Sequence, residues 1–231
     1  MKIRYLGHSA VVVSVAGLEV GIDPWLEGNP LCPKDVINTK LDIIALTHGH
    51  ADHASDVVRI FNLHGAKVAA TYELACILKD EGVDASKLVY MNTGGTVQIN
   101  GVSITLTPAF HSSSYDTKSR GTLYAGQPCG VVVRAGGKSL YHAGDTALFS
   151  DMKLIGEQYK PDLAMLPIGD CFTMGVEDAV AAAKLLGVKK VVPIHHSTFP
   201  LLTGSPQVFS ELCAKDGILA NVLKSGQILD L

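Results

Sequence analysis

The 231-residue sequence predicts an α/β protein, specifically a four-layer αββα sandwich in which two mixed β-sheets face each other beneath outer helices. Two observations lead to this fold class. The first quarter of the chain reads as short β segments, after which strands and helices alternate, and the second half repeats that order. Packing the two halves face to face buries the apolar strands of both. Since α/β folds of this length are commonly single units, one domain spanning residues 1–231 is expected.

Short runs of apolar or β-branched residues predict the strands of the first half. These runs are residues 2–6, 10–15, 18–22, 41–47 and 66–70. Apolar residues then recur at helical spacing in two segments, which predicts helices over 54–63 and 72–79.

In the second half the same reasoning predicts strands at residues 101–110, 129–135, 138–145, 161–168 and 189–195. Helices are expected near 148–158, over 176–186 and before residue 220. Residues 111–128, HSSSYDTKSRGTLYAGQP, are polar and lack apolar periodicity. They predict a long irregular loop, which is either functional or a solvated surface excursion.

The charge and cysteine content narrow the function classes. A formal net charge of −3 provides no general attraction to phosphate backbones, so a small-molecule substrate is expected rather than nucleic acid. No segment has the apolar length of a membrane span and the N-terminus has no signal-peptide core, so a cytoplasmic protein is expected, with a homo-oligomer as an option. Five cysteines without a CxxC pair fit reduced thiols, and Cys171 is expected to be buried.

Histidines concentrate in THGHADH, where His48, His50, Asp52 and His53 fall within six positions. They follow a predicted buried strand and precede a predicted helix, so several side chains can point into one small volume. Imidazoles and a carboxylate suit Zn²⁺ and similar divalent ions. Taken alone, the four residues could close a tetrahedral structural site.

Three further candidate ligands, His111, Asp145 and His195, each stand at a polar turn after a predicted strand. Together with the four residues of the histidine cluster, they make seven candidate ligands. One metal ion cannot take seven ligands, whereas two ions with open coordination positions can.

These residues, in this order and spacing, resemble the metallo-β-lactamase superfamily over essentially the whole chain. Longer stretches are similar to a family of small, largely uncharacterised metal-dependent hydrolases related to ascorbate-6-phosphate lactonase. The stretches are YLGHSA, IDPW, THGHADH, YHAGDTALFSDMKLIG, LPIGDCFTMGVEDA and TFP. The resemblance implies the αββα metallo-β-lactamase fold already inferred from the strand pattern.

The resemblance also implies a ligand set. His48, His50 and His111 would hold one metal, Asp52, His53 and His195 the second, and Asp145 would bridge them. The expected cofactor is two divalent ions, with Zn²⁺ first and Mn²⁺, Ni²⁺ or iron as alternatives. The double histidine leaves His196 as an alternative to His195, which is favoured because it follows the strand VVPI directly.

Other polar residues near these motifs are candidates for roles beside the metals. Asp23, at a strand end before Pro24, can accept the free N–H of a ligand histidine, although a simple turn role is an alternative. His8 and Thr173 are candidates for the substrate pocket or for contacts with ligands. A buried, hydrogen-bonded imidazole is the preferred interpretation of His142. His64, before Gly65, fits a helix end.

The resulting hypothesis is a hydrolase in which a hydroxide on a dinuclear metal centre cleaves a small ester, lactone or phosphodiester, with Asp52 as the catalytic proton acceptor. A phosphodiester would call for cations, and Lys118 and Arg120 are the nearest candidates by sequence. The alternatives are an iron-dependent oxidoreductase of the same fold and a nuclease acting on nucleic acid.

Overall fold

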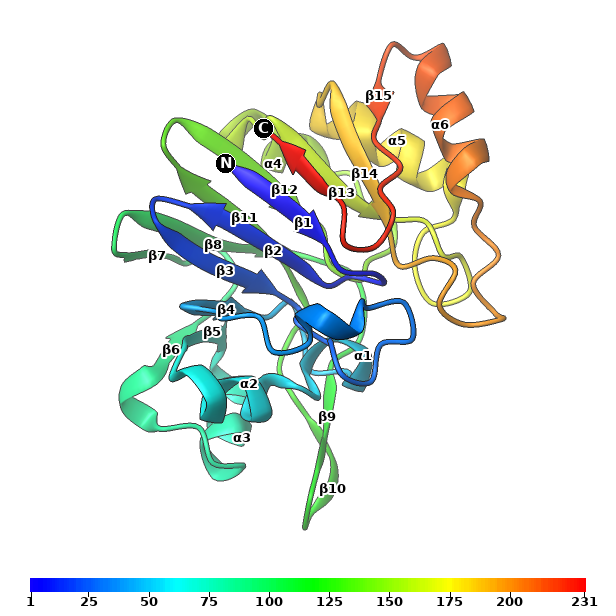
Figure 1. The fold of residues 1–231 in the computed structure, drawn as a ribbon. Helices are drawn as coiled ribbons and strands as arrows, with labels where there is room; N and C mark the ends of the chain where they lie inside the picture. The colour runs from blue at the N-terminus through cyan, green and yellow to red at the C-terminus, as the bar shows by residue number, and fades with distance from the viewer.

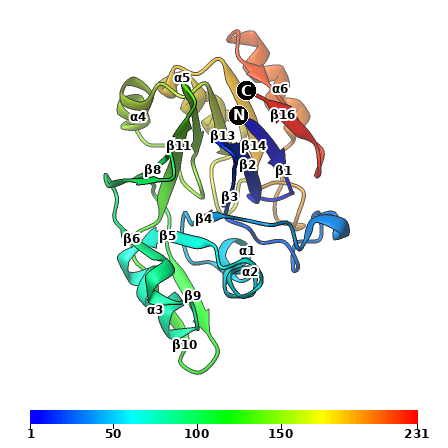
Figure 2. The ribbon, with the colours of Figure 1, turned by 60° about the vertical axis from the view of Figure 1, so that its left-hand side comes forward.

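The computed structural model describes residues 1–231 and contains two seven-stranded mixed β-sheets. The sheets face each other, and helices cover the outer face of each (Figure 1). Figure 2 shows α2 (Val57–His64) and α3 (Tyr72–Asp80) beside the first sheet and α4 (Met152–Tyr159) and α5 (Val176–Leu186) beside the second. The predicted four-layer αββα sandwich is confirmed.

The first sheet is built from the N-terminal part of the chain and one C-terminal strand. Its spatial order is β16 (Ile228–Asp230), β1 (Lys2–Tyr5), β2 (Val11–Val15), β3 (Leu18–Ile22), β4 (Ile43–Ala45), β5 (Lys67–Thr71) and β6 (Leu88–Met91). Strands β16 to β3 pair antiparallel, and β3 to β6 pair in parallel. Pairing of β16 with β1 brings the two chain ends together (Figure 1).

The second sheet comes from the remainder of the chain. Its spatial order is β15 (Leu219–Ala220), β14 (Lys190–Ile194), β13 (Leu163–Pro167), β12 (Lys138–His142), β11 (Cys129–Ala135), β8 (Val102–Pro108) and β7 (Thr96–Ile99). Strands β15 to β12 pair in parallel, and β12, β11, β8 and β7 pair antiparallel. Each sheet therefore has a parallel part whose carboxyl ends can carry a ligand site.

Three apolar clusters lie between the four layers. The central cluster joins residues of both sheets, such as Val13 and Val131. A second packs the first sheet against α2 (Val57–His64) and α3 (Tyr72–Asp80), and a third packs the second sheet against α4 (Met152–Tyr159), α5 (Val176–Leu186) and α6 (Pro206–Lys215). None of these helices combines the length and apolar character needed to traverse a bilayer.

The helix expected over 54–63 is divided into α1 (Ala51–Ala54) and α2. Asp56 stands at the break, and its Oδ2 accepts the backbone N–H groups of Leu26 at 2.6 Å and Glu27 at 2.7 Å. The helix ends where Gly65 adopts a left-handed conformation with φ of 65°. Short 3₁₀ turns at Lys34–Val36 and Ala85–Lys87 complete the connections of this half.

Two sequence expectations are wrong. Residues 111–128 are not an irregular loop, because β9 (Ser114–Thr117) and β10 (Gly121–Tyr124) form a hairpin that projects from the sandwich (Figure 1). Only Tyr115 and Thr117 of β9 are buried, so the hairpin has almost no apolar periodicity to reveal it. Cys171 is exposed rather than buried, because it lies in a surface turn after β13.

Candidate metal centre

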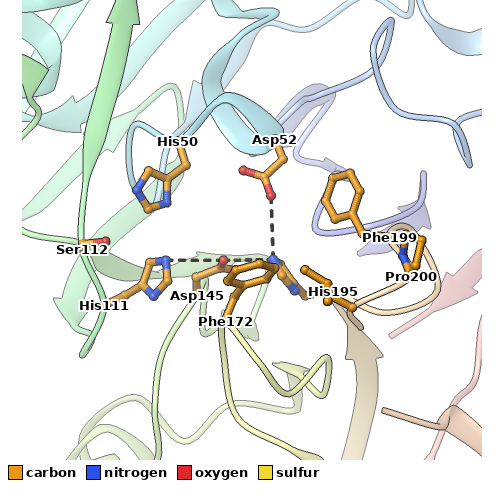
Figure 3. A pocket seen from close by; sticks show the side chains of 10 residues that line it. His50, Asp52, His111, Ser112, Asp145, Phe172, His195, Phe199 and Pro200 are labelled. Carbon is orange, nitrogen blue, oxygen red and sulfur yellow. Dashed lines mark ion pairs between the residues drawn. The ribbon is translucent and has the colours of Figure 1, made fainter. Parts of the chain in front are cut away.

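Loops at the ends of strands from both sheets meet at one edge of the sandwich. The loop after β4 and the helix α1 that follows it carry the histidine cluster, and loops after β8, β12 and β14 carry His111, Asp145 and His195. Figure 3 shows five of these side chains converging on a common space: His50, Asp52, His111, Asp145 and His195. Candidate ligand atoms form one group of His48, His50 and His111 and another of Asp52, His53, His195 and His8, with all atoms of a group within 4.8 Å of one another.

The turn between β4 and α1 needs glycine at its centre. A Cβ atom on Gly49 would lie 2.8 Å from both the Cβ of Ala125 and the carbonyl oxygen of Ser114, which belong to the hairpin segment. The hairpin therefore packs directly on the backbone between His48 and His50. Extended φ and ψ of −60° and 151° at His50 then start helix α1, which carries Asp52 and His53.

In the first group, the ring nitrogens of His48 and His50 lie directly against each other. His48 Nε2 lies 3.0 Å from His50 Nδ1, and the other nitrogen of His48, Nδ1, donates to Thr47 Oγ1 at 2.9 Å. The His111 ring lies 5.2 Å from the His48 and His50 rings. Burial lowers the pKa of all three imidazoles, which favours the neutral form that binds metals.

At the second group, His195 and His53 face two carboxylates, Asp52 of the group and Asp145 beside it. His195 Nε2 lies 3.0 Å from Asp145 Oδ2 and 3.9 Å from Asp52 Oδ2. His53 Nε2 lies 3.4 Å from Asp145 Oδ1 and 4.0 Å from Asp52 Oδ1. Asp145 also lies 3.7 Å from His111 Nε2 of the first group, so this one carboxylate contacts both groups.

The donor set fits a divalent cation. His53 Nε2 and Asp145 Oδ1 are buried and have no hydrogen-bond partner, which is unusual for polar atoms in a protein interior. Burial acts to lower the pKa of His53, but Asp145 and Asp23 outweigh it and raise that pKa well above the usual value. The buried carboxylates thus favour a positive charge at the point where the orphaned atoms meet. Nitrogen and oxygen donors of this kind are those that Zn²⁺ and related ions prefer.

Asp23 orients two of these histidines from beneath. Its Oδ2 accepts from His53 Nδ1 at 2.8 Å and from the Thr47 hydroxyl, while Oδ1 accepts the Thr47 backbone N–H at 2.8 Å. Because the same hydroxyl receives the Nδ1 proton of His48, both rings present Nε2 to the site. Asp23 is fully buried and therefore contacts no substrate.

His8 connects Asp52 to the loop after β14. Its Nε2 donates to Asp52 Oδ2 at 3.0 Å, and its Nδ1 lies 2.9 Å from the Thr198 hydroxyl. The His8 carbonyl accepts the backbone N–H of His195 at 2.9 Å. Burial lowers the pKa of His8 to about 4, although the hydrogen bond to Asp52 acts in the opposite direction.

Four other residues considered above lie outside the two groups. His142 Nε2 donates to the Ser9 carbonyl at 2.9 Å and its Nδ1 accepts the Gly144 N–H at 3.1 Å, so both nitrogens are used within the core. The Thr173 hydroxyl donates to the Met174 carbonyl at 3.3 Å. His196 stacks on Tyr5 at 6.4 Å between ring centroids, away from the candidate ligand atoms, whereas His195 points among them. His64 ends α2.

A pocket of about 530 Å³ opens over the two groups. Ten residues line it: His50, Asp52, His111, Ser112, Asp145, Phe172, His195, Phe199, Pro200 and Leu201 (Figure 3). The sequence reasoning did not single out Ser112 or the four apolar residues. Their only signal was position at the ends of predicted strands: Phe172 lies in IGDCFTMG, Phe199 and Pro200 lie in TFP, and Ser112 and Leu201 directly follow His111 and TFP.

The expectation that Lys118 and Arg120 stand near the pocket is wrong. Arg120 pairs with Asp80 at 3.0 Å, and Lys118 lines a separate cavity of about 170 Å³ beside Glu81. Both belong to the turn of the projecting hairpin, which carries them away from the strand ends.

Comparison with known proteins identifies the family. The model of the beta-lactamase superfamily domain matches residues 19–196. The chain belongs to the metallo-β-lactamase superfamily. Within this superfamily it is 46% identical to a UPF0173 metal-dependent hydrolase of Geobacillus thermodenitrificans, over 100% of both chains. It is 47% identical to one from Thermus thermophilus, over 100% of this chain and 99% of the relative.

A solved structure supports the assignment to the metallo-β-lactamase superfamily. Igni18, a metallo hydrolase from the archaeon Ignicoccus hospitalis, superimposes with a TM-score of 0.88 at 37% sequence identity, covering 100% of this chain and 98% of that one. Because relatives identical at 46–47% over the whole chain are metal-dependent hydrolases, this member of the superfamily is one too.

Proposed function

We propose that the protein hydrolyses a small ester, lactone or phosphodiester at a dinuclear metal centre. His48, His50 and His111 would hold one ion and Asp52, His53 and His195 the other, with Asp145 between them. The observation that carries this proposal is the position of Asp145, whose carboxylate lies within 4 Å of ring nitrogens from both groups. A structural site closed by the THGHADH residues alone would not need the three distant ligands.

Two ions bound there, with Zn²⁺ as the first choice, would supply hydroxide at neutral pH and polarise the bond under attack. Asp52 is suited to orient the attacking water and to accept its proton, because its side chain is about one quarter exposed and lines the pocket. Burial acts to raise the pKa of Asp52, but the His8 hydrogen bond and the charge of His53 lower it below the usual value. The carboxylate is therefore ionised at neutral pH.

Asp52→Asn and His50→Ala test this proposal. Each should lower kcat by at least about a hundredfold, since one removes the proton acceptor and the other a proposed ligand. His50→Ala should also lose bound metal, measured by elemental analysis, while His64→Ala, at the end of α2, keeps both activity and metal. Full turnover in both site variants would refute the assignment. Iron as the main metal, with oxygen consumption and no hydrolysis, would favour an oxidoreductase instead.

A further inference from the structure

The pocket over the candidate metal centre has two chemically different sides. One side carries the proposed ligands and Ser112. The remaining lining residues, here called the apolar wall, are Phe172, Phe199, Pro200 and Leu201. Figure 3 shows Phe199 and Pro200 across the pocket from His50, His111 and Ser112. The Phe172 and Leu201 side chains are 49% and 59% exposed, so the protein leaves apolar surface in solvent directly beside its polar groups. Exposed apolar surface in a concave site is typical of ligand recognition.

Two loops build the apolar wall, and the protein fixes them to each other. Phe172 lies in the loop after β13, and Phe199 to Leu201 lie in the loop after β14. The Thr203 N–H donates to the Gly169 carbonyl at 3.0 Å. At Gly204, a Cβ atom would overlap the Ile168 carbonyl, so the second loop approaches the end of β13 too closely for any side chain there.

Phe199 also packs against Trp25 and against His8, the residue that is hydrogen-bonded to Asp52. Its ring stacks on Trp25 at 6.0 Å and meets the edge of His8 at 5.4 Å. His8 in turn donates to Asp52. The distance between the apolar wall and the proposed proton acceptor is therefore set by direct packing.

No lysine or arginine is among the residues that line the pocket. A phosphate or carboxylate on a substrate, away from the bond that reacts, would lie against phenyl and leucyl groups without a cationic partner. Moving such a charge out of water without a partner is strongly unfavourable. An alkyl or aryl group in the same place would bury surface favourably.

Building on the proposed hydrolase function, we propose that the substrate is a neutral carboxylic ester or lactone with an uncharged, apolar acyl group that packs on the apolar wall. Hydrolysis breaks the acyl C–O bond, joins the oxygen of water to the acyl carbon and delivers a proton to the leaving alkoxide. Acyl groups that carry a remote anion, as in a phosphorylated lactone, are excluded.

Nitrophenyl esters of increasing acyl length test this proposal with the metal-loaded protein. From acetate through butyrate to hexanoate, kcat/KM should rise about fourfold per added methylene, because each is worth about 0.8 kcal/mol when buried. The isocaproate and hemisuccinate esters have nearly the same shape and differ in the terminal charge. Hemisuccinate should react at least about tenfold more slowly. Equal or faster hydrolysis of hemisuccinate would overturn the proposal.

Leu201→Lys should reverse this preference by placing a cation on the apolar wall. The variant should lose activity on isocaproate and gain activity on hemisuccinate. Leu154→Lys is a matched control, because Leu154 is 58% exposed and lies on α4, away from the pocket lining. An equal change in both variants would show that added charge, rather than the apolar wall, sets the preference, and would refute the proposal.

Binding to chelator-treated protein separates this proposal from the proposed function. Isocaproamide should bind metal-free wild-type protein, measured by calorimetry, and bind Leu201→Lys at least about fivefold more weakly. If isocaproamide binds in this way but no ester is cleaved, the hydrolytic proposal fails while apolar recognition stands. If esters are cleaved but isocaproamide does not bind and chain length has no effect, the apolar wall does not select the substrate.

Discussion

His8 illustrates how a residue outside the proposed ligand set can control the chemistry of one inside it. It is fully buried and adopts a φ of 55°, which is uncommon for a residue with a side chain. That conformation lets its ring reach Asp52 while its carbonyl receives the His195 N–H. Residues in unfavourable backbone conformations persist where surrounding contacts require them.

We expect His8→Gln to lower kcat about tenfold to a hundredfold while bound metal and KM stay close to wild type. Loss of the hydrogen bond to Asp52 removes an influence that lowers the pKa of this carboxyl, so the acidic limb of the kcat/KM profile should move to higher pH. A pH titration of initial rates measures this. An unmoved acidic limb with reduced kcat would indicate that His8 only supports the fold. His64→Gln serves as the control.

His142 should make the metal-free protein sensitive to acid. Burial lowers its pKa below the ordinary value of 6.5, so the unfolded chain binds a proton before the folded protein does as pH falls from 6.5 towards the lowered value. In that interval the group reduces the free energy of unfolding by at most about 1.4 kcal/mol per pH unit. Urea unfolding of chelator-treated protein should show a shallower pH dependence for His142→Gln. An identical slope for both proteins would contradict this.

Residue types and spacing predict the seven candidate ligands because imidazoles and carboxylates at strand ends are rare, and the structure brings all seven side chains to one edge of the sandwich. That they bind metal stays a prediction. The choice between His195 and His196 was harder, since adjacent residues differ only in the direction that the backbone gives each ring. The segment IGDCFTMG was a candidate pocket wall, but the sequence did not single out Phe172 within it, and nothing indicated Leu201. An apolar side chain carries no chemical signal until the fold shows that it is exposed beside polar groups.

At the scale of elements, the contact between α4 and α5 depends on a residue without a side chain. A Cβ atom on Gly156 would overlap the backbone of Leu186 at the end of α5, lying 2.6 Å from its carbonyl carbon. The third apolar cluster includes residues of both helices, such as Ile155 and Ala183. The two helices therefore approach more closely than they could with alanine at this position.

Gly156→Ala should lower the free energy of unfolding by about 2 kcal/mol. Alanine gains about 1 kcal/mol of helix propensity, but the overlap with a backbone group costs more than this. Glu157→Ala, at a position about 60% exposed on the same helix, should change stability by less than about 0.5 kcal/mol. Denaturant unfolding measures both. A stabilised Gly156→Ala protein would mean that the helices separate at little cost.

The hairpin of β9 and β10 could not be predicted from the pattern of apolar residues. Strands packed on both faces, such as 129–135, give continuous apolar runs and were predicted to the residue. The hairpin buries only part of one strand, and its polar residues are held by local bonds such as Thr117 Oγ1 to the Gly121 carbonyl at 2.9 Å. Such bonds leave no periodic trace in a sequence.

For the whole molecule, chelation should lower the melting temperature of the protein. The proposed ligands come from loops of both sheets, so a bound ion links the two halves and is released on unfolding. An ion present at a hundred times its dissociation constant adds about 2.7 kcal/mol to the free energy of unfolding. Calorimetry before and after chelation, with recovery on adding Zn²⁺, measures this. An unchanged melting temperature in protein shown to have lost its metal would contradict the linkage.

The division of the ligand set between the two halves also bears on how the protein assembles. Residues 48–53 belong to the first half, whereas His111, Asp145 and His195 come from the second and are up to 147 positions distant from His48. Contacts of such long range form late in folding, because long loops must close first. Neither half can capture both ions by itself. During refolding, metal uptake should therefore occur later than strand formation. The time at which metal binds should then report the time at which the two sheets dock.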